Sequence, residues 1–215
     1  MNSKMAASGW LAGALALAAG PAMAGTISGS AHDFSISAWS GGKICVACHV
    51  PHNALASVTA APLWNHTVTT QVYTVYSSST LKAVMGQPSS SSKLCLSCHD
   101  GTVAVDSYNV ATGTTFISAA NKLGTNLNVH HPSSFLYDTA LAAANGALFD
   151  PTAKVVTIGG GAQTKTGTIA SVMLYGGQVE CSTCHDVHNT YTATTTGLLK
   201  ISMSRSAMCF TCHNY

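Results

Sequence analysis

The sequence predicts a mostly irregular, loop-rich fold with a few short helices and one small hairpin. Three observations support this. Charged side chains make up only 7% of the 215 residues, against roughly 25% in an ordinary soluble domain. Gly, Ser, Thr and Asn dominate the chain, and no long amphipathic period appears. All eight cysteines fall into copies of one short motif. Side chains alone are therefore not expected to build a conventional core.

The charge balance excludes some function classes. A formal net charge of +2 supplies no basic stripe to neutralise the phosphates of a nucleic acid. It also provides no run of like charges that would keep a tail disordered by self-repulsion.

The first 24 residues have the pattern of an export signal. Lys4 is followed by an uncharged apolar stretch, 9–20, and by Ala22-Met23-Ala24, which is an A-x-A cleavage pattern. The stretch is too short to span a bilayer of about 30 Å, and no later run is long enough. We expect residues 1–24 to be cleaved from a secreted protein that begins at Gly25 and has no membrane span.

The cysteines form four C-x-x-C pairs, and each pair is followed at once by a histidine. The pairs are Cys45 and Cys48, Cys95 and Cys98, Cys181 and Cys184, and Cys209 and Cys212, followed by His49, His99, His185 and His213. C-x-x-C-H is the attachment motif of c-type haem. Two thiols on one helical turn form thioethers with the two vinyl groups of a porphyrin, and the adjacent imidazole ligates the iron. The sequence therefore predicts four covalently attached haem c groups, with these cysteines as anchors and these histidines as proximal ligands.

Three other readings of the cysteines are weaker. Structural zinc held by paired C-x-x-C knuckles would not require a histidine after every pair. A thioredoxin-like redox pair would occur once and not four times. Disulfides fit an exported protein but do not explain the histidines.

Six further histidines can supply the sixth ligand of each iron. They are His32, His52, His66, His130, His131 and His188. His52 and His188 each follow a proximal histidine by three residues, on a segment whose own iron is already ligated from that side. We expect both to reach a different haem, which brings neighbouring haems into near contact.

The other candidates differ in their local context. Pro132 holds His131 extended, so we prefer His131 to its neighbour His130. His66 follows the apolar pair Leu63-Trp64, and His32 lies near the predicted mature N-terminus. Bis-histidine ligation with low reduction potentials is therefore expected, with distal ligands drawn from His32, His52, His66, His131 and His188.

The chain also shows an internal duplication. The first and third motifs both continue to a histidine and then Asn, as His52-Asn53 and His188-Asn189. An apolar pair follows each of these motifs at nearly equal distance. We therefore divide the mature chain, 25–215, into two two-haem units, at about 25–100 and 176–215, with a spacer at about 101–175.

Regular structure is expected at few places. Short helices are predicted at each motif and at 139–145, and a hairpin is predicted between 155–157 and 168–172. The segments 89–92 and 194–196 are predicted to be loops. The fold class is then a multihaem cytochrome c in which the haems form the core. The thioethers are the covalent cross-links that a small loop-rich fold needs.

Several motifs together resemble those of the small tetrahaem cytochromes of metal-respiring bacteria, and most of all the OmcE-type extracellular cytochromes that polymerise into nanowire filaments. The segments are HDF from His32, CVACHVPHN from Cys45, PLWNH ending at His66, KLCLSCHDGT from Lys93, HP at 131 and 132, and CSTCHDVHN from Cys181. The resemblance implies bis-histidine haems in a continuous stacked chain, with one haem completed by a histidine of the adjoining subunit. By similarity to a related hexahaem filament cytochrome, His52 is the residue that crosses.

We therefore expect extracellular electron transfer without a catalytic site. The expected partners are identical subunits joined head to tail, redox proteins and extracellular electron acceptors. His213 lies two residues before Tyr215, so the fourth haem of one subunit can meet the first haem of the next, and a head-to-tail contact that does not close gives an open filament. The alternatives are a monomeric periplasmic or outer-surface shuttle and, less favoured, a multihaem reductase, for which no C-x-x-C-K variant marks an open iron.

Overall fold

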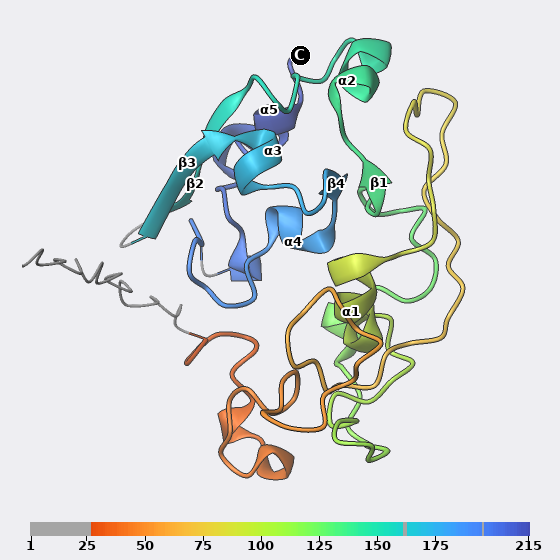
Figure 1. The fold of residues 1–215 in the computed structure, drawn as a ribbon, viewed down its shortest axis with the longest axis vertical. Helices are drawn as coiled ribbons and strands as arrows, with labels where there is room; N and C mark the ends of the chain where they lie inside the picture. Colours follow the sequence, from red (N-terminus) through yellow and green to blue (C-terminus); the bar gives the residue numbers. More distant parts are fainter. Residues whose placement is uncertain (1–26, 161–162, 195) are drawn as a thin grey trace, which may run out of the picture.

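The computed structural model describes residues 27–160, 163–194 and 196–215 (Figure 1). The predicted export signal, 1–24, lies outside the described residues. The orange turns at residues 34–40 lie at one end of the long axis, the C-terminus lies at the other, and α1 and α4 lie between them (Figure 1). In the part of the chain that is described, no helix is long and apolar enough to cross a membrane.

Helices are few and short, as predicted. The α-helices are α1 Ser90–His99, α2 Thr139–Asn145, α3 Ile169–Val172, α4 Cys181–Cys184 and α5 Cys209–Cys212. Single 3-10 turns are η1 Phe34–Ile36, η2 Ala38–Ser40, η3 Ala119–Asn121, η4 Thr196–Leu198 and η5 Ser204–Ser206. The prediction for α2 is confirmed: the Asp138 carboxylate accepts the backbone N–H of Leu141 at its start, and Gly146 ends it in the left-handed conformation.

The strands form two small antiparallel sheets. Strand β2, Val155–Gly160, pairs with β3, Gln163–Thr168, and β1, Phe135–Leu136, pairs with β4, Gln178–Val179. The predicted hairpin is confirmed, but its second strand was placed too late in the chain. Residues 169–172 form α3 instead, because the Thr168 hydroxyl accepts the N–H of Ser171 and Ile169 and Val172 are both buried.

The prediction of a loop at 89–92 was wrong, since α1 begins at Ser90. Tertiary contacts hold its first turn. The Ser92 N–H donates to the Glu180 carboxylate at 3.2 Å, and the Ser92 hydroxyl accepts the N–H of Cys181 at 2.9 Å. At the other predicted loop, 194–196, η4 begins at residue 196, and residue 195 lies outside the described part.

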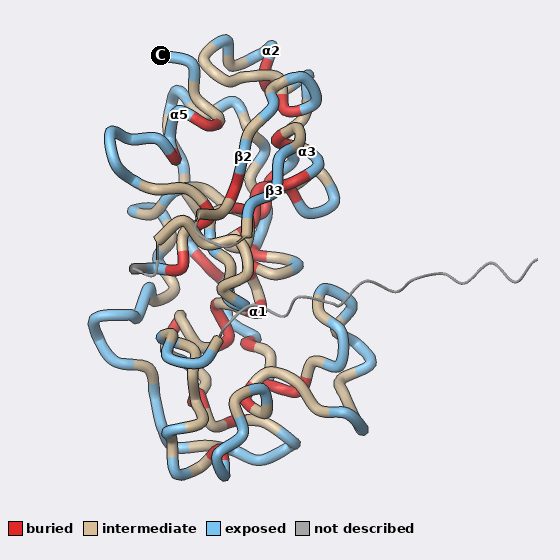
Figure 2. The backbone as a smooth tube through the Cα atoms, turned by 90° about the vertical axis from the view of Figure 1, so that its left-hand side faces the viewer, coloured by how far each residue is buried: buried red, intermediate tan, exposed pale blue. Residues whose placement is uncertain are grey.

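The structure also contains a small apolar core, which the sequence analysis did not expect. Its buried members are Phe135, Tyr137, Ala142, Ile158, Ile169, Val172, Met173, Leu174, Val179 and Met208. Most of them come from the predicted spacer, and Cys184 and Cys212 pack against them. Elsewhere, buried segments are short and scattered (Figure 2). The apolar core therefore supports the third and fourth motifs more than the first two.

Candidate functional site

Each of the four motifs closes one turn of backbone. The second ends α1, while the third and fourth form α4 and α5. The first lies in a turn and not in a helix, yet the His49 N–H donates to the Cys45 carbonyl at 2.8 Å. His185 and His213 donate in the same way to Cys181, at 3.1 Å, and to Cys209, at 2.9 Å. All eight thiols are free, so each motif presents two thiols on one turn for thioether bonds.

Three of the four predicted proximal histidines are held through Nδ1. This nitrogen lies 2.7 Å from the Pro62 carbonyl in His49, 2.9 Å from the Asn121 carbonyl in His99, and 2.6 Å from the Gly197 carbonyl in His185. With Nδ1–H as the donor, Nε2 keeps its lone pair, which is how proteins orient an imidazole for a metal. His213 differs, because its buried Nδ1 has no partner.

The duplication seen in the sequence is repeated in the backbone hydrogen bonds. The Cys48 carbonyl accepts the N–H of Asn65 at 2.8 Å, and the Cys184 carbonyl accepts the N–H of Lys200 at 2.8 Å. Asn65 and Lys200 therefore occupy equivalent positions, each on the segment that pairs with a haem-attachment motif.

The same pairs of segments share unusual backbone angles. Leu63 and Leu198 have φ of 54° and 51°, and Asn53 and Asn189 have φ of 59° and 55°. A left-handed conformation is costly for leucine, so its occurrence at both equivalent positions indicates one local structure built twice.

Two pairs of histidines face each other at a distance that suits one iron. The ring centres of His49 and His188 are 6.2 Å apart with an interplanar angle of 23°, and those of His32 and His99 are 6.1 Å apart. Two imidazoles on opposite sides of one metal have ring centres about 6 Å apart, because each metal–nitrogen bond is about 2.0 Å long. Each pair joins a predicted proximal ligand to a predicted distal one.

The fourth motif has a predicted distal ligand, His131, among the electrostatic neighbours of His213. Burial, followed by the neighbouring His131, lowers the pKa of His213. Burial likewise lowers the pKa of His32 to about 4, with smaller contributions from His99, His185 and His188. Both imidazoles are therefore neutral near pH 7, the form that can ligate iron.

The other predicted distal ligands lie in different surroundings. His66 is 1% exposed, with Nδ1 2.8 Å from the Thr67 carbonyl and Nε2 3.0 Å from the Ala104 carbonyl. In the described part of the chain its ring contact is with Trp64 and not with an imidazole, and its Nε2 lies 3.4 Å from the Cys98 sulfur. His52 is exposed. The assignment of both as ligands stays a prediction.

Thiols of successive motifs lie close together in chain order. Burial, and then the nearby Cys48 thiol of the first motif, raise the pKa of Cys98 in the second to about 12. A side-chain hydrogen bond to Cys181 of the third motif raises the pKa of Cys95 in the second.

Thiols of the third and fourth motifs also interact. Burial, and then the Cys184 thiol, raise the pKa of Cys212 to about 12. The order in space is therefore first, second, third and fourth.

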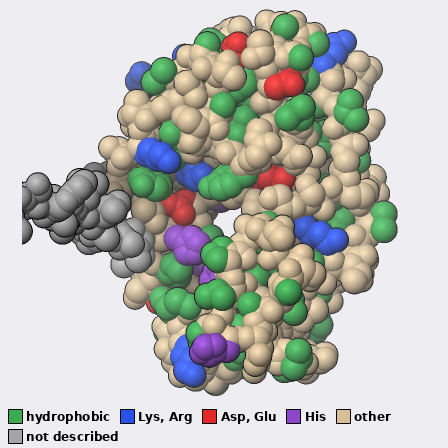
Figure 3. Space-filling view, viewed as in Figure 1, with side chains coloured by type: hydrophobic (Ala, Val, Ile, Leu, Met, Phe, Trp, Pro, Cys, Tyr) green, Lys and Arg blue, Asp and Glu red, His purple; other side chains and the backbone are tan. Residues whose placement is uncertain are grey.

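The residues present fit haem at these motifs. Among the described residues, the buried side-chain atoms without a hydrogen-bond partner are His32 Nδ1, Asn65 Nδ2, Glu180 Oε1 and His213 Nδ1. Glu180 and His213 adjoin or belong to a motif, Asn65 pairs with the first motif, and His32 lies near His99 of the second. The molecule is hollowed through its middle, with histidine side chains at the rim (Figure 3). Within the described ranges, no group of three or more His, Cys, Asp or Glu is arranged to hold a metal ion by itself. Each motif instead offers two free thiols and an imidazole, the groups to which a c-type haem attaches.

Sequence reasoning missed the residue that holds the end of α1. Asp100 is 1% exposed and accepts the Tyr73 hydroxyl at 2.6 Å, the Thr69 hydroxyl at 2.7 Å and the Thr102 N–H at 2.7 Å. Burial raises the pKa of Asp100, but these hydrogen bonds outweigh it and lower the pKa overall. The sequence signal for Asp100 is its position directly after the second C-x-x-C-H motif.

We expect Asp100→Asn to lower the free energy of unfolding by about 3 kcal/mol, because an amide leaves buried donors without an acceptor. Denaturant unfolding of the haem-loaded protein, followed by circular dichroism, measures this loss. Asp150→Asn is the matched control, since that carboxylate is solvated and its loss should be much smaller. Equal losses in the two variants would contradict a structural role for Asp100.

Comparison with known proteins supports the haem motifs. Residues 175–215 match the family described as doubled CXXCH motif. This match covers the third and fourth motifs, and the first two lie outside it. No curated protein matches the chain. The doubled motif, read with the free thiols and facing imidazoles, indicates a haem-binding electron-transfer protein of the multihaem cytochrome c kind.

Proposed function

We propose that this chain is the subunit of an extracellular filament that carries electrons through four closely spaced haem c groups. The observation that carries the proposal is the order of the motifs, because thiols of each motif are close enough to those of the following one to raise the pKa of a thiol in one of the two. When bound, each haem supplies an iron that exchanges one electron. The chain anchors the porphyrins, ligates the irons and excludes water around them.

The facing imidazoles support bis-histidine ligation. We assign His188 to the iron of His49, His32 to that of His99, and His131 to that of His213. His188 thus serves the first motif while lying on the segment of the third. The predicted two-haem units, 25–100 and 176–215, are then joined by a shared ligand.

The third motif has no ring pair of this kind among the described residues, since the imidazole that senses His185, that of His32, is the one that we assign to His99. By the duplication, His52 is the counterpart of His188, and it is exposed. We assign His52 to this iron in the adjoining subunit, which makes assembly a requirement for complete ligation.

The surface at the fourth motif suits a contact between subunits. Phe210 is 49% exposed and Tyr215 is 85% exposed. The Tyr215 ring stacks on His213 with ring centres 5.3 Å apart and an interplanar angle of 11°. Exposed apolar groups at one end mark a binding surface, and a surface with few charges does not oppose self-association.

Export is part of the same proposal. The pattern in 1–24 directs the chain out of the cytoplasm. The proposed partners are then identical subunits, redox proteins of the cell envelope and extracellular electron acceptors.

His52→Ala tests the assembly. We expect filaments in electron micrographs of the parent protein and a large loss of filaments in the variant, with the haem content unchanged. His130→Ala is the matched control and should assemble normally. A variant that assembles fully while one iron becomes high-spin would place His52 on an iron of its own chain. A monodisperse monomer of the parent at all concentrations would support the monomeric shuttle instead.

A further inference from the structure

Two buried nitrogen donors occupy the equivalent positions of the duplicated segments. Asn65 is 4% exposed and Lys200 is 3% exposed, and each donates its backbone N–H to the second cysteine of a motif, Cys48 or Cys184. One position therefore carries a neutral donor in the first copy and a cation in the second.

Among the described residues, no hydrogen bond joins either donor to an acidic group. The Asn65 Nδ2 atom is buried and has no hydrogen-bond partner. The Lys200 ammonium donates to the Tyr175 hydroxyl at 3.2 Å and lies 5.1 Å from the centre of that ring. A buried ammonium without an anion is unfavourable. At the same place in the fold, Lys200 therefore lacks an anionic partner and Asn65 lacks an acceptor.

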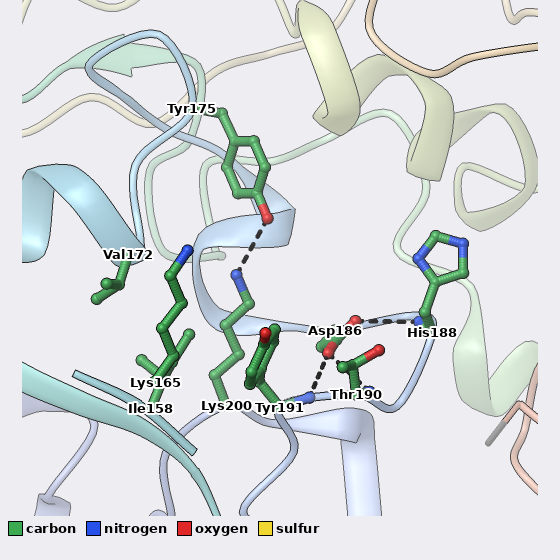
Figure 4. Close-up of a pocket in the computed structure, with 9 residues that line it drawn as sticks. All are labelled: Ile158, Lys165, Val172, Tyr175, Asp186, His188, Thr190, Tyr191 and Lys200. Carbon is green, nitrogen blue, oxygen red and sulfur yellow. Dashed lines mark hydrogen bonds between the residues drawn. The ribbon is translucent and has the colours of Figure 1, made fainter. Parts of the chain in front are cut away.

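The surroundings of Lys200 form a pocket of about 230 Å³. Lys165 and Lys200 run side by side into it, and the Tyr175 hydroxyl points at the Lys200 ammonium (Figure 4). Asp186 also lines the pocket, but its carboxylate already accepts the backbone N–H groups of His188, Thr190 and Tyr191. The pocket therefore presents two cations and a hydroxyl, a donor set suited to a carboxylate.

Haem carries two carboxylates, and the pocket borders the segment of the third motif. His188 lines it, and the Lys200 backbone pairs with Cys184. Asn65 holds the same relation to the first motif.

We propose that Asn65 and Lys200 each donate to a propionate carboxylate of a bordering haem, and that the difference in their charge separates the reduction potentials of the two copies. This inference rests on the proposed function. A cation beside a haem favours the reduced iron, which carries one positive charge less than the oxidised iron. The haem that contacts Lys200 is therefore held at a higher potential than its counterpart at Asn65.

Exchange of the two residues tests the proposal. In the haem-loaded protein, Lys200→Asn should lower the reduction potential of one haem, and Asn65→Lys should raise that of another. We expect a change of at least tenfold in each one-electron equilibrium, which is about 59 mV. Spectroelectrochemical titration, with haem-resolved NMR signals, measures the potentials and shows which haem responds. Lys165→Met, at an exposed residue of the same pocket, should shift the same haem as Lys200→Asn by a smaller amount.

The matched control is Lys82→Asn, which removes the same charge from an exposed residue outside the pocket. If Lys200→Asn and Lys82→Asn have the same haem reduction potentials, the inference is wrong, although the haems are bound. A parent potential that changes with added acetate or phosphate at constant ionic strength would overturn it too, because the pocket would then hold a free anion. Absence of haem from the parent protein would instead overturn the proposed function.

Discussion

Replacement of both Cys181 and Cys184 by serine is expected to yield a protein with one haem fewer and an interrupted electron path. The Cys181 thiol hydrogen-bonds to Cys95 of the second motif, and Cys184 neighbours Cys212 of the fourth. Loss of the porphyrin between them leaves the first two haems separated from the last. Soret absorbance should fall by about a quarter if the four haems absorb equally.

The measurement is intact mass together with the rate at which an electron donated to the first haem reaches the fourth. Ser182→Ala is the matched control, because it changes the same helix and spares both thiols. A double variant that keeps the full haem mass, or transfers electrons end to end at the parent rate, would show that the third motif does not anchor a haem in the path.

The second large effect is expected from His188→Ala. His188 faces His49 with ring centres 6.2 Å apart, so the variant should leave one iron with a single protein ligand. We expect one of the irons to change from low-spin to high-spin in the electron paramagnetic resonance spectrum, with no loss of covalent haem, because the thioethers are unaffected.

His130→Ala is the control, since it removes an imidazole that faces no proximal histidine in the described part of the chain. Its spectrum should match that of the parent protein. An all-low-spin spectrum from His188→Ala would contradict the assignment of His188 to the first iron.

The attachment motifs and the duplication could be predicted from the sequence because they are local. Spacing alone places two thiols and an imidazole on one turn, and the structure shows this turn in all four motifs. The helix at 139–145 was likewise predicted correctly, since Asp138 and Gly146 carry its capping signals.

Features that depend on distant contacts could not be predicted. The start of α1 is held by Glu180, 88 residues away, and the pairing of His49 with His188 joins two motifs across the chain. Sequence reasoning ranked His66 among the distal ligands by its apolar neighbours, but the carbonyls that face its ring, from Thr67 and Ala104, are brought there by the fold.

The buried donors show the same limit. Asn65 and Lys200 differ in type, so only the matching hydrogen bonds to Cys48 and Cys184 identify them as one position. Lys200 follows its motif by many residues in the sequence. It reaches the motif only through the backbone hydrogen bond to Cys184, so the motif and its immediate neighbours in the sequence do not reveal it.

The central claim is that every C-x-x-C-H motif holds a covalent haem. Intact-mass spectrometry of the exported protein, combined with its visible spectrum, tests it most directly. We predict the mass of the polypeptide from Gly25 plus one haem for each of the four cysteine pairs, with a strong Soret band. A colourless protein with the bare polypeptide mass would contradict the account.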